Sequence, residues 1–97
     1  MKTFYTDYVN HCLRFYARHP EPTFRSEADE KNWSACKEAL GEFNDKDKET
    51  LTTIFREGDT IPDNVYQISK AMGVKQDGIW KLISDLERKV AKKRGLI

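Results

Sequence analysis

Long apolar runs are missing from this sequence, and cysteine, proline and glycine are scarce. No apolar run approaches the roughly 20 residues that a membrane-spanning helix needs, and no signal peptide is visible, so we expect a cytoplasmic protein without a membrane partner. The chain has only two cysteines, Cys12 and Cys36. Each falls on an apolar stripe, which indicates reduced core residues rather than a disulfide. A length of 97 residues supports a single domain with one core.

The usual signals of catalysis and metal binding are also missing. No glycine-rich phosphate loop, nucleophile elbow or kinase signature is present. The few serines all have structural roles as helix caps or polar-face residues. His11 and His19, taken with Cys12 and Cys36, lack the paired spacing of a zinc site. We therefore expect neither an enzyme nor a metal-binding protein, and we expect no cofactor.

Charge of either sign is not in excess overall, but it is unevenly distributed. The formal net charge is +1. Residues 58–97 carry eight Lys and Arg against five Asp and Glu, whereas residues 1–57 carry nine against eleven. After Glu87 there is no acid, and the cations there are Arg88, Lys89, Lys92, Lys93 and Arg94. This positive end suits either contact with phosphate or a solvated last turn whose cations favour the helix dipole.

The spacing of apolar residues predicts an all-α fold: a compact five-helix domain over residues 1–97. Helices are expected over about residues 3–19, 26–40, 44–58, 62–72 and 76–94. Pro20 and Pro22 should end the first, Ser26 and Asn44 should cap the second and third, and Gly73 should provide a left-handed turn. The expected core stripes comprise Phe4, Tyr5, Tyr8, Val9, Cys12, Phe15, Tyr16, Trp33, Cys36, Leu40, Phe43, Leu51, Ile54, Phe55, Val65, Ile68, Met72, Ile79, Ile83, Leu86 and Val90.

Residues 1–43 are expected to be supporting helices, and residues 44–97 to hold a C-terminal helix-turn-helix. In that motif two crossed helices meet at a glycine turn, and the second helix usually enters the major groove of DNA. The apolar residues expected to lock the two helices together are Ile68, Met72, Val74 and Ile79.

This stretch resembles a known family. The order Ile68-Ser69-x-x-Met72-Gly73-Val74-Lys75-x-x-Gly78-Ile79 resembles the helix-turn-helix of sigma-factor region four and related bacterial regulators. The segment around Leu51, Ile54 and Phe55 resembles the helix before that pair, and residues 86–97 are similar to the ends of small phage- and transposon-borne proteins of this kind. The resemblance covers about residues 45–97. It implies sequence-specific binding of double-stranded DNA by a bacterial transcriptional regulator of phage or mobile-element origin, with RNA polymerase as a further partner.

The last expected helix supplies the candidate DNA-binding residues. Its polar face lies opposite the apolar stripe, and its N-terminal end usually enters the groove. Gln pairs with adenine and Lys with guanine, while an Asp there accepts from cytosine or favours the helix N-terminus. The candidates are Lys75, Gln76, Asp77, Lys81, Ser84, Arg88 and Lys92.

Two departures from the family pattern and one large side chain leave alternatives open. Lys75 replaces the usual serine N-cap, and Gly78 replaces threonine at a cost of about 1 kcal/mol relative to alanine. Either the helix begins later, or its backbone approaches something closely at Gly78. Trp80 lies off the core stripe, so it either packs against the N-terminal helices or touches the DNA.

The main rival function is a protein-interaction adaptor. Sigma-type region four also binds RNA polymerase, and the acidic first half of the chain suits a protein partner. The aromatic residues of the first expected helix, flanked by Arg14 and Arg18, form either a homodimerisation face or simply the core of the domain.

Overall fold

A computed structural model describes residues 3–21 and 23–97, and these residues form five helices and no strand. The all-α prediction is therefore confirmed, whereas Pro22 lies outside the described residues. No helix in the described part of the chain has the length and apolar character to cross a bilayer. The helices are α1 (Thr6–Arg18), α2 (Glu27–Leu40), α3 (Asp45–Arg56), α4 (Ile61–Met72) and α5 (Gln76–Lys93).

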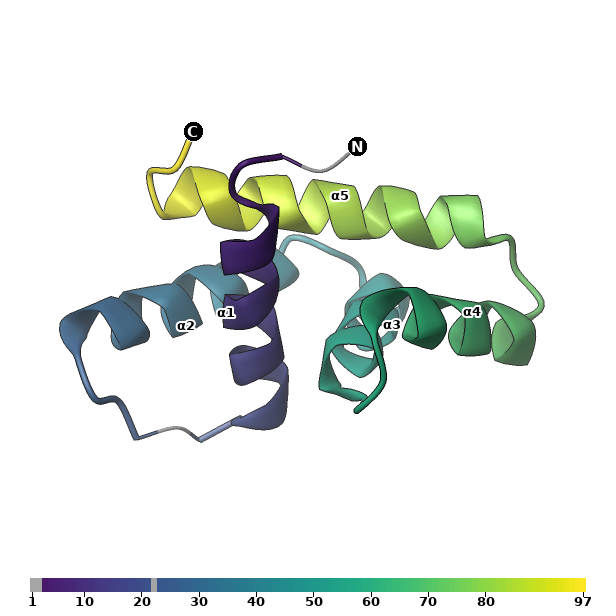
Figure 1. The fold of residues 1–97 in the computed structure, drawn as a ribbon, viewed down its shortest axis with the longest axis horizontal. Helices are drawn as coiled ribbons and strands as arrows, with labels where there is room; N and C mark the ends of the chain where they lie inside the picture. The colour runs from purple at the N-terminus through teal and green to yellow at the C-terminus, as the bar shows by residue number, and fades with distance from the viewer. Residues whose placement is uncertain (1–2, 22) are drawn as a thin grey trace.

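Helix α5 is the element that joins the two halves of the fold. Figure 1 shows it lying along one long edge, with α3 and α4 beneath its first half and α1 and α2 beneath its second half. Helix α1 also packs against both α2 and α3, so the two halves share one core. The principal extents are 40 × 27 × 24 Å.

Side-chain caps define where three of the helices begin. The side chain of Ser26 accepts a hydrogen bond from the backbone N–H of Asp29, as expected, and Asn44 does the same for Asp47. Thr60, which we did not predict as a cap, begins α4 in the same way. Such caps satisfy backbone N–H groups that have no partner within the helix.

The predicted core is confirmed for α3 and α5, and it is partly wrong for α1. Every expected core residue of α3 and α5 is buried. Phe4, by contrast, is 81% exposed and Tyr8 is 44% exposed. Phe4 precedes the first turn of α1, where no other helix covers it, and Leu13 is buried in the core instead.

The junction between α3 and α4 is held by side chains from elsewhere in the chain. Arg14 donates hydrogen bonds to the carbonyl oxygens of Glu57 and Asp59. Arg18 donates to the carbonyl of Glu57 at 3.0 Å. The buried amide of Asn64 donates to the carbonyl of Ile54 at 2.8 Å. Because the last carbonyls of a helix have no partner within the helix, these contacts fix where α3 ends and α4 begins.

The turn between α4 and α5 adopts the predicted backbone but not the predicted packing. Gly73 has φ 67°, the left-handed conformation expected of it. Met72 is 40% exposed and Val74 is 41% exposed, so the expectation that they lock the two helices is wrong. The described residues from Lys70 to Gly78 are all exposed, and the turn therefore projects from the body. In the view of Figure 1, α4 and α5 run in opposite directions.

Candidate functional site

The polar face of α5 is accessible along its whole length. Lys75, Gln76, Asp77, Lys81, Ser84, Arg88 and Lys92 are all exposed. The opposite side of the helix carries Ile79, Ile83, Leu86 and Val90, which are buried. At 1.5 Å per residue, the candidate residues extend over about 26 Å. Asp77, Lys81, Ser84, Arg88 and Lys92 form a ridge along one side of α5, and Lys75 and Gln76 lie at its N-terminal end.

Trp80 belongs to the packed side of α5. Its ring is half-buried against the core. This position favours the packing interpretation over direct contact with DNA.

The start of α5 lacks the side-chain cap that stabilises the starts of α2, α3 and α4. Lys75 occupies the N-cap position and makes no cap hydrogen bond. Its positive charge also opposes the positive end of the helix dipole. Gly78 lies within the first turn, where a Cβ would meet nothing within 4 Å. Within this chain, therefore, no packing requires glycine there.

We expect Gly78→Ala to stabilise the isolated chain. Alanine fits the open space and is favoured over glycine in a helix by about 0.5–1 kcal/mol. Chemical denaturation should show a higher midpoint at an unchanged slope. Gly73→Ala is the matched control and should destabilise, because φ there is 67°. A loss of stability in Gly78→Ala would contradict the open space seen at that position.

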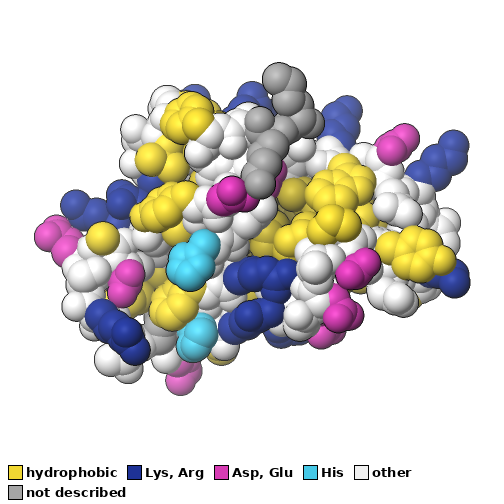
Figure 2. Space-filling model, in the orientation of Figure 1, with side chains coloured by type: hydrophobic (Ala, Val, Ile, Leu, Met, Phe, Trp, Pro, Cys, Tyr) yellow, Lys and Arg dark blue, Asp and Glu magenta, His cyan; other side chains and the backbone are white. Residues whose placement is uncertain are grey.

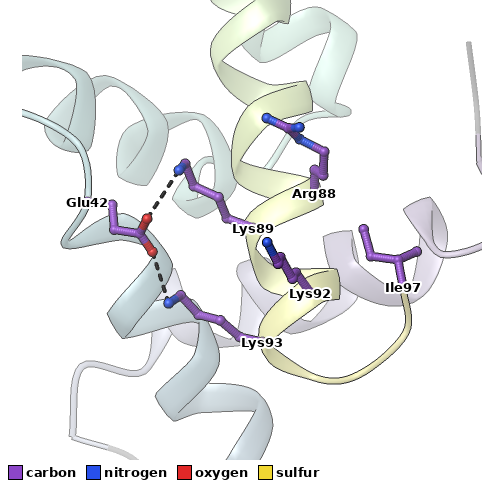
Figure 3. A pocket seen from close by; sticks show the side chains of 6 residues that line it. All are labelled: Glu42, Arg88, Lys89, Lys92, Lys93 and Ile97. Carbon is purple, nitrogen blue, oxygen red and sulfur yellow. Dashed lines mark hydrogen bonds and ion pairs between the residues drawn. The ribbon is translucent and has the colours of Figure 1, made fainter.

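The C-terminal end of α5 forms a cationic groove that the sequence interpretation did not describe. The groove has a volume of about 650 Å³ and lies beside the connection between α2 and α3. Its lining consists of Glu42, Arg88, Lys89, Lys92, Lys93 and Ile97. Figure 3 shows Glu42 facing Lys89 and Lys93, with Lys92 and Arg88 on the neighbouring side of the helix. We refer to these six residues as the cationic groove.

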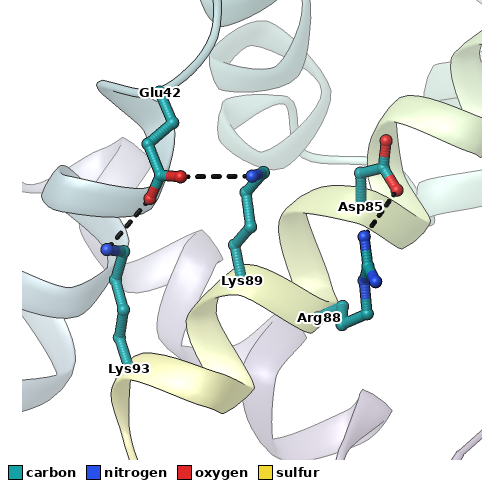
Figure 4. A network of polar contacts seen from close by, with 5 residues as sticks. All are labelled: Glu42, Asp85, Arg88, Lys89 and Lys93. Atoms are coloured by element: carbon teal, nitrogen blue, oxygen red, sulfur yellow. Dashed lines mark hydrogen bonds and ion pairs between the residues drawn. The ribbon is translucent and has the colours of Figure 1, made fainter.

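Glu42 is the acidic partner inside the cationic groove. Its carboxylate lies 2.9 Å from Nζ of Lys93 and 3.1 Å from Nζ of Lys89 (Figure 4). Hydrogen bonds from Lys93 and Lys89 lower the pKa of Glu42, and the Glu42 carboxylate raises the pKa of Lys93. The side chain of Lys89 also lies over the ring of Phe43, 5.9 Å from its centroid.

The second pair of cations in the groove is less fully compensated. Arg88 lies 3.5 Å from Asp85 in an exposed pair within α5. No ion pair to Lys92 is found among the described residues. Because exposed ion pairs of this kind contribute little, Arg88 and Lys92 remain available to an anion from outside.

One sequence signal pointed towards Glu42. Arg88 and Lys92, and likewise Lys89 and Lys93, are like charges four residues apart on a helix, an arrangement that is destabilising. An acidic side chain from another element would relieve this repulsion. Nothing in the local sequence identifies Glu42 as that acid, because it lies 47 residues away from Lys89.

A second hollow, of about 610 Å³, lies between α1 and the start of α2, and its lining mixes acids, a base and histidines: His11, Cys12, Phe15, His19, Glu21, Thr23, Arg25, Asp29 and Asn32. Figure 2 shows Lys and Arg side chains in several separate groups on one face, with the two histidines near its centre. The described residues contain no group of three or more His, Cys, Asp or Glu able to hold a metal ion. Cys12 and Cys36 are unbonded and buried, and burial raises the pKa of Cys36 to about 12. Neither thiol is therefore activated as a nucleophile.

Known proteins supply no further guide to these surfaces. The chain matches no model of a protein family, no curated protein sequence and no solved structure.

Proposed function

We propose that this protein binds double-stranded DNA through the exposed polar face of α5, as a transcriptional regulator of the sigma region-four type. The observation that carries the proposal is the composition of that face. It presents four cations, Lys75, Lys81, Arg88 and Lys92, against the carboxylates of Asp77 and Asp85, of which Asp85 lies 3.5 Å from Arg88, and none of these side chains is buried. A cationic ridge of this kind is the electrostatic footprint of a nucleic-acid-binding surface.

The weak start of α5 supports the same proposal. Lys75 and Gly78 both cost local stability, and both lie where a recognition helix first meets DNA. Departures from local stability rules are expected at functional positions. A bare backbone at Gly78 leaves room for close approach by a partner, while Lys75 and Gln76 supply groups suited to guanine and adenine.

In this proposal, the two ends of α5 have different tasks. Lys75, Gln76 and Lys81 face base edges, because a major groove about 12 Å wide admits only one end of the ridge. Arg88 and Lys92 lie farther along the helix and contact the phosphate backbone. Helix α4, the connection 73–75 and α5 would then act as a helix-turn-helix, with Gly73 as its turn.

The test is salt-dependent binding to duplex DNA. We expect retention of a random duplex in a gel shift at low salt, with affinity falling linearly on a log–log plot. Each neutralised phosphate contributes about 0.9 to that slope. Selection from a random duplex pool then reveals whether α5 reads sequence. Absence of duplex binding at low salt would end the proposal.

An adaptor function is the second candidate, and one observation favours it. The last turn of α4 and the following connection expose two apolar side chains, with Met72 40% and Val74 41% exposed, and Tyr66 in the middle of α4 is 46% exposed. Apolar groups gathered at a projecting end are typical of protein contacts. A partner such as RNA polymerase or a second copy would cover them, and size-exclusion chromatography beside the gel shift separates these outcomes.

A further inference from the structure

The number of cations in the cationic groove is greater than the stability of α5 requires. A basic last turn favours the helix dipole, but that benefit needs no paired rows of like charges. Arg88 and Lys92 form one row, and Lys89 and Lys93 form the other. Like charges four residues apart are destabilising to a helix. The carboxylate of Glu42 compensates the second row, whereas the first row has only the exposed pair between Arg88 and Asp85.

Glu42 occupies the groove in the way that an external anion would. Its two oxygens contact two different ammonium groups: Oε1 lies 3.1 Å from Lys89 and Oε2 lies 2.9 Å from Lys93. Oxygen atoms that each accept from a separate cation are also what a phosphate group provides. The carboxylate side chain remains 44% exposed and belongs to a short connection, so it can leave without disturbing a helix.

We propose that the cationic groove is a phosphate-binding site in which Glu42 is a built-in competitor. An incoming phosphate group takes the place of the Glu42 carboxylate on Lys89 and Lys93. It also meets Arg88 and Lys92, which line the same groove and which Glu42 does not pair with in the structure.

The phosphate group has two possible sources, the backbone of a nucleic acid or a free phosphorylated molecule. The groove recognises the same chemistry in both cases. The inference therefore stands apart from the proposed reading of bases by the start of α5, because a free phosphorylated ligand requires no DNA contact there.

The first experiment is an NMR titration of the full chain with inorganic pyrophosphate at pH 7. We expect saturable shifts at the side-chain carboxyl of Glu42 and the Nζ groups of Lys89 and Lys93. Sodium chloride at matched ionic strength should not reproduce them, because screening alone does not saturate. Shifts that merely follow ionic strength would overturn the inference.

The second experiment compares two substitutions that remove one negative charge each. Glu42→Gln should bind pyrophosphate about threefold to tenfold more tightly, since it removes an exposed competitor of modest strength. Glu21→Gln is the matched control, because Glu21 lies in the segment between α1 and α2, on the far side of the molecule from α5 (Figure 1). Equal affinity of the two variants for pyrophosphate would show that Glu42 only anchors the α2–α3 connection to α5 and does not compete with phosphate.

A final arm separates the two sources of phosphate. Duplex DNA added to the pyrophosphate complex should release pyrophosphate if the groove takes a nucleic acid backbone. If pyrophosphate binds saturably and duplex does not displace it, the source is a free phosphorylated molecule. If the chain also fails to bind duplex, the proposed DNA function fails while the phosphate site stands.

Discussion

Lys81→Glu combined with Arg88→Glu should abolish retention of duplex DNA while leaving the fold intact. Both side chains are exposed on the polar face of α5, so their reversal removes no packing contact. It places two carboxylates where the proposal puts phosphates, and like charges then repel. Surface substitutions of this kind usually change stability by no more than about 0.5 kcal/mol. A gel shift at low salt and a thermal melt measure the two effects.

The neutral versions of the same substitutions give a finer measure. Lys81→Gln with Arg88→Gln should lower the log–log salt slope by about 1.8 if each residue contacts one phosphate. Arg25→Glu with Lys31→Glu is the matched charge control, because both residues lie at or near the start of α2, at the opposite end of the molecule from the start of α5 (Figure 1). Equal losses of affinity in the two reversed pairs would indicate that net charge, and not α5, controls binding.

Phe55→Ala should cost about 3–5 kcal/mol of stability, the range seen for large aromatic truncations in cores. Phe55 is 1% exposed and is the largest of the fully buried side chains. It lies on α3, which contacts α1, α4 and α5, so the cavity would open where the two halves meet. Domains of this size have total stabilities of about 5–15 kcal/mol, and the loss is therefore a large fraction of the whole. Urea denaturation should show a much lower midpoint.

The chain contains its own control for that experiment. Phe4→Ala makes the same chemical change at a side chain that is 81% exposed. We expect a change of no more than about 0.5 kcal/mol there. Similar losses at Phe4 and Phe55 would contradict the placement of one inside the core and the other outside it.

The helices were predictable because their signals are local. Apolar residues at helical spacing marked α3 and α5, and the caps Ser26 and Asn44 marked two helix starts, all within a few residues of the feature they define. Gly73 was recognisable for the same reason, since a left-handed residue favours glycine.

Burial at the ends of helices was less predictable. Periodicity identifies which side of a helix is apolar, but not whether another element covers it. Met72 continues the stripe of Val65 and Ile68, yet the last turn of α4 extends into the exposed region 70–78. Phe4 belongs to the pattern of α1 but precedes the helix itself. In both cases the apolar spacing is present in the sequence, but no other helix of the described chain covers that end.

Contacts between distant residues were not predictable from one sequence. Arg14 and Arg18 were expected only to flank a homodimerisation face or the core of the domain, whereas their guanidinium groups bind carbonyls about 40 residues later. Glu42 was not singled out at all, although it determines the electrostatics at the end of α5. The exposure of the α5 polar face, by contrast, agrees with the prediction for all of its candidate residues.

The hydrogen bonds from α1 to the α3–α4 junction have a consequence for folding and for any attempt to truncate the chain. Arg14 and Arg18 lie in the first fifth of the sequence, and their side chains contact the junction at which α4 begins. A fragment beginning near residue 44 would leave those carbonyls without their guanidinium partners and would expose the side of α5 that rests on α1 and α2. We therefore expect that residues 44–97 alone do not fold stably, and that the N-terminal helices and the last helix melt together in one transition.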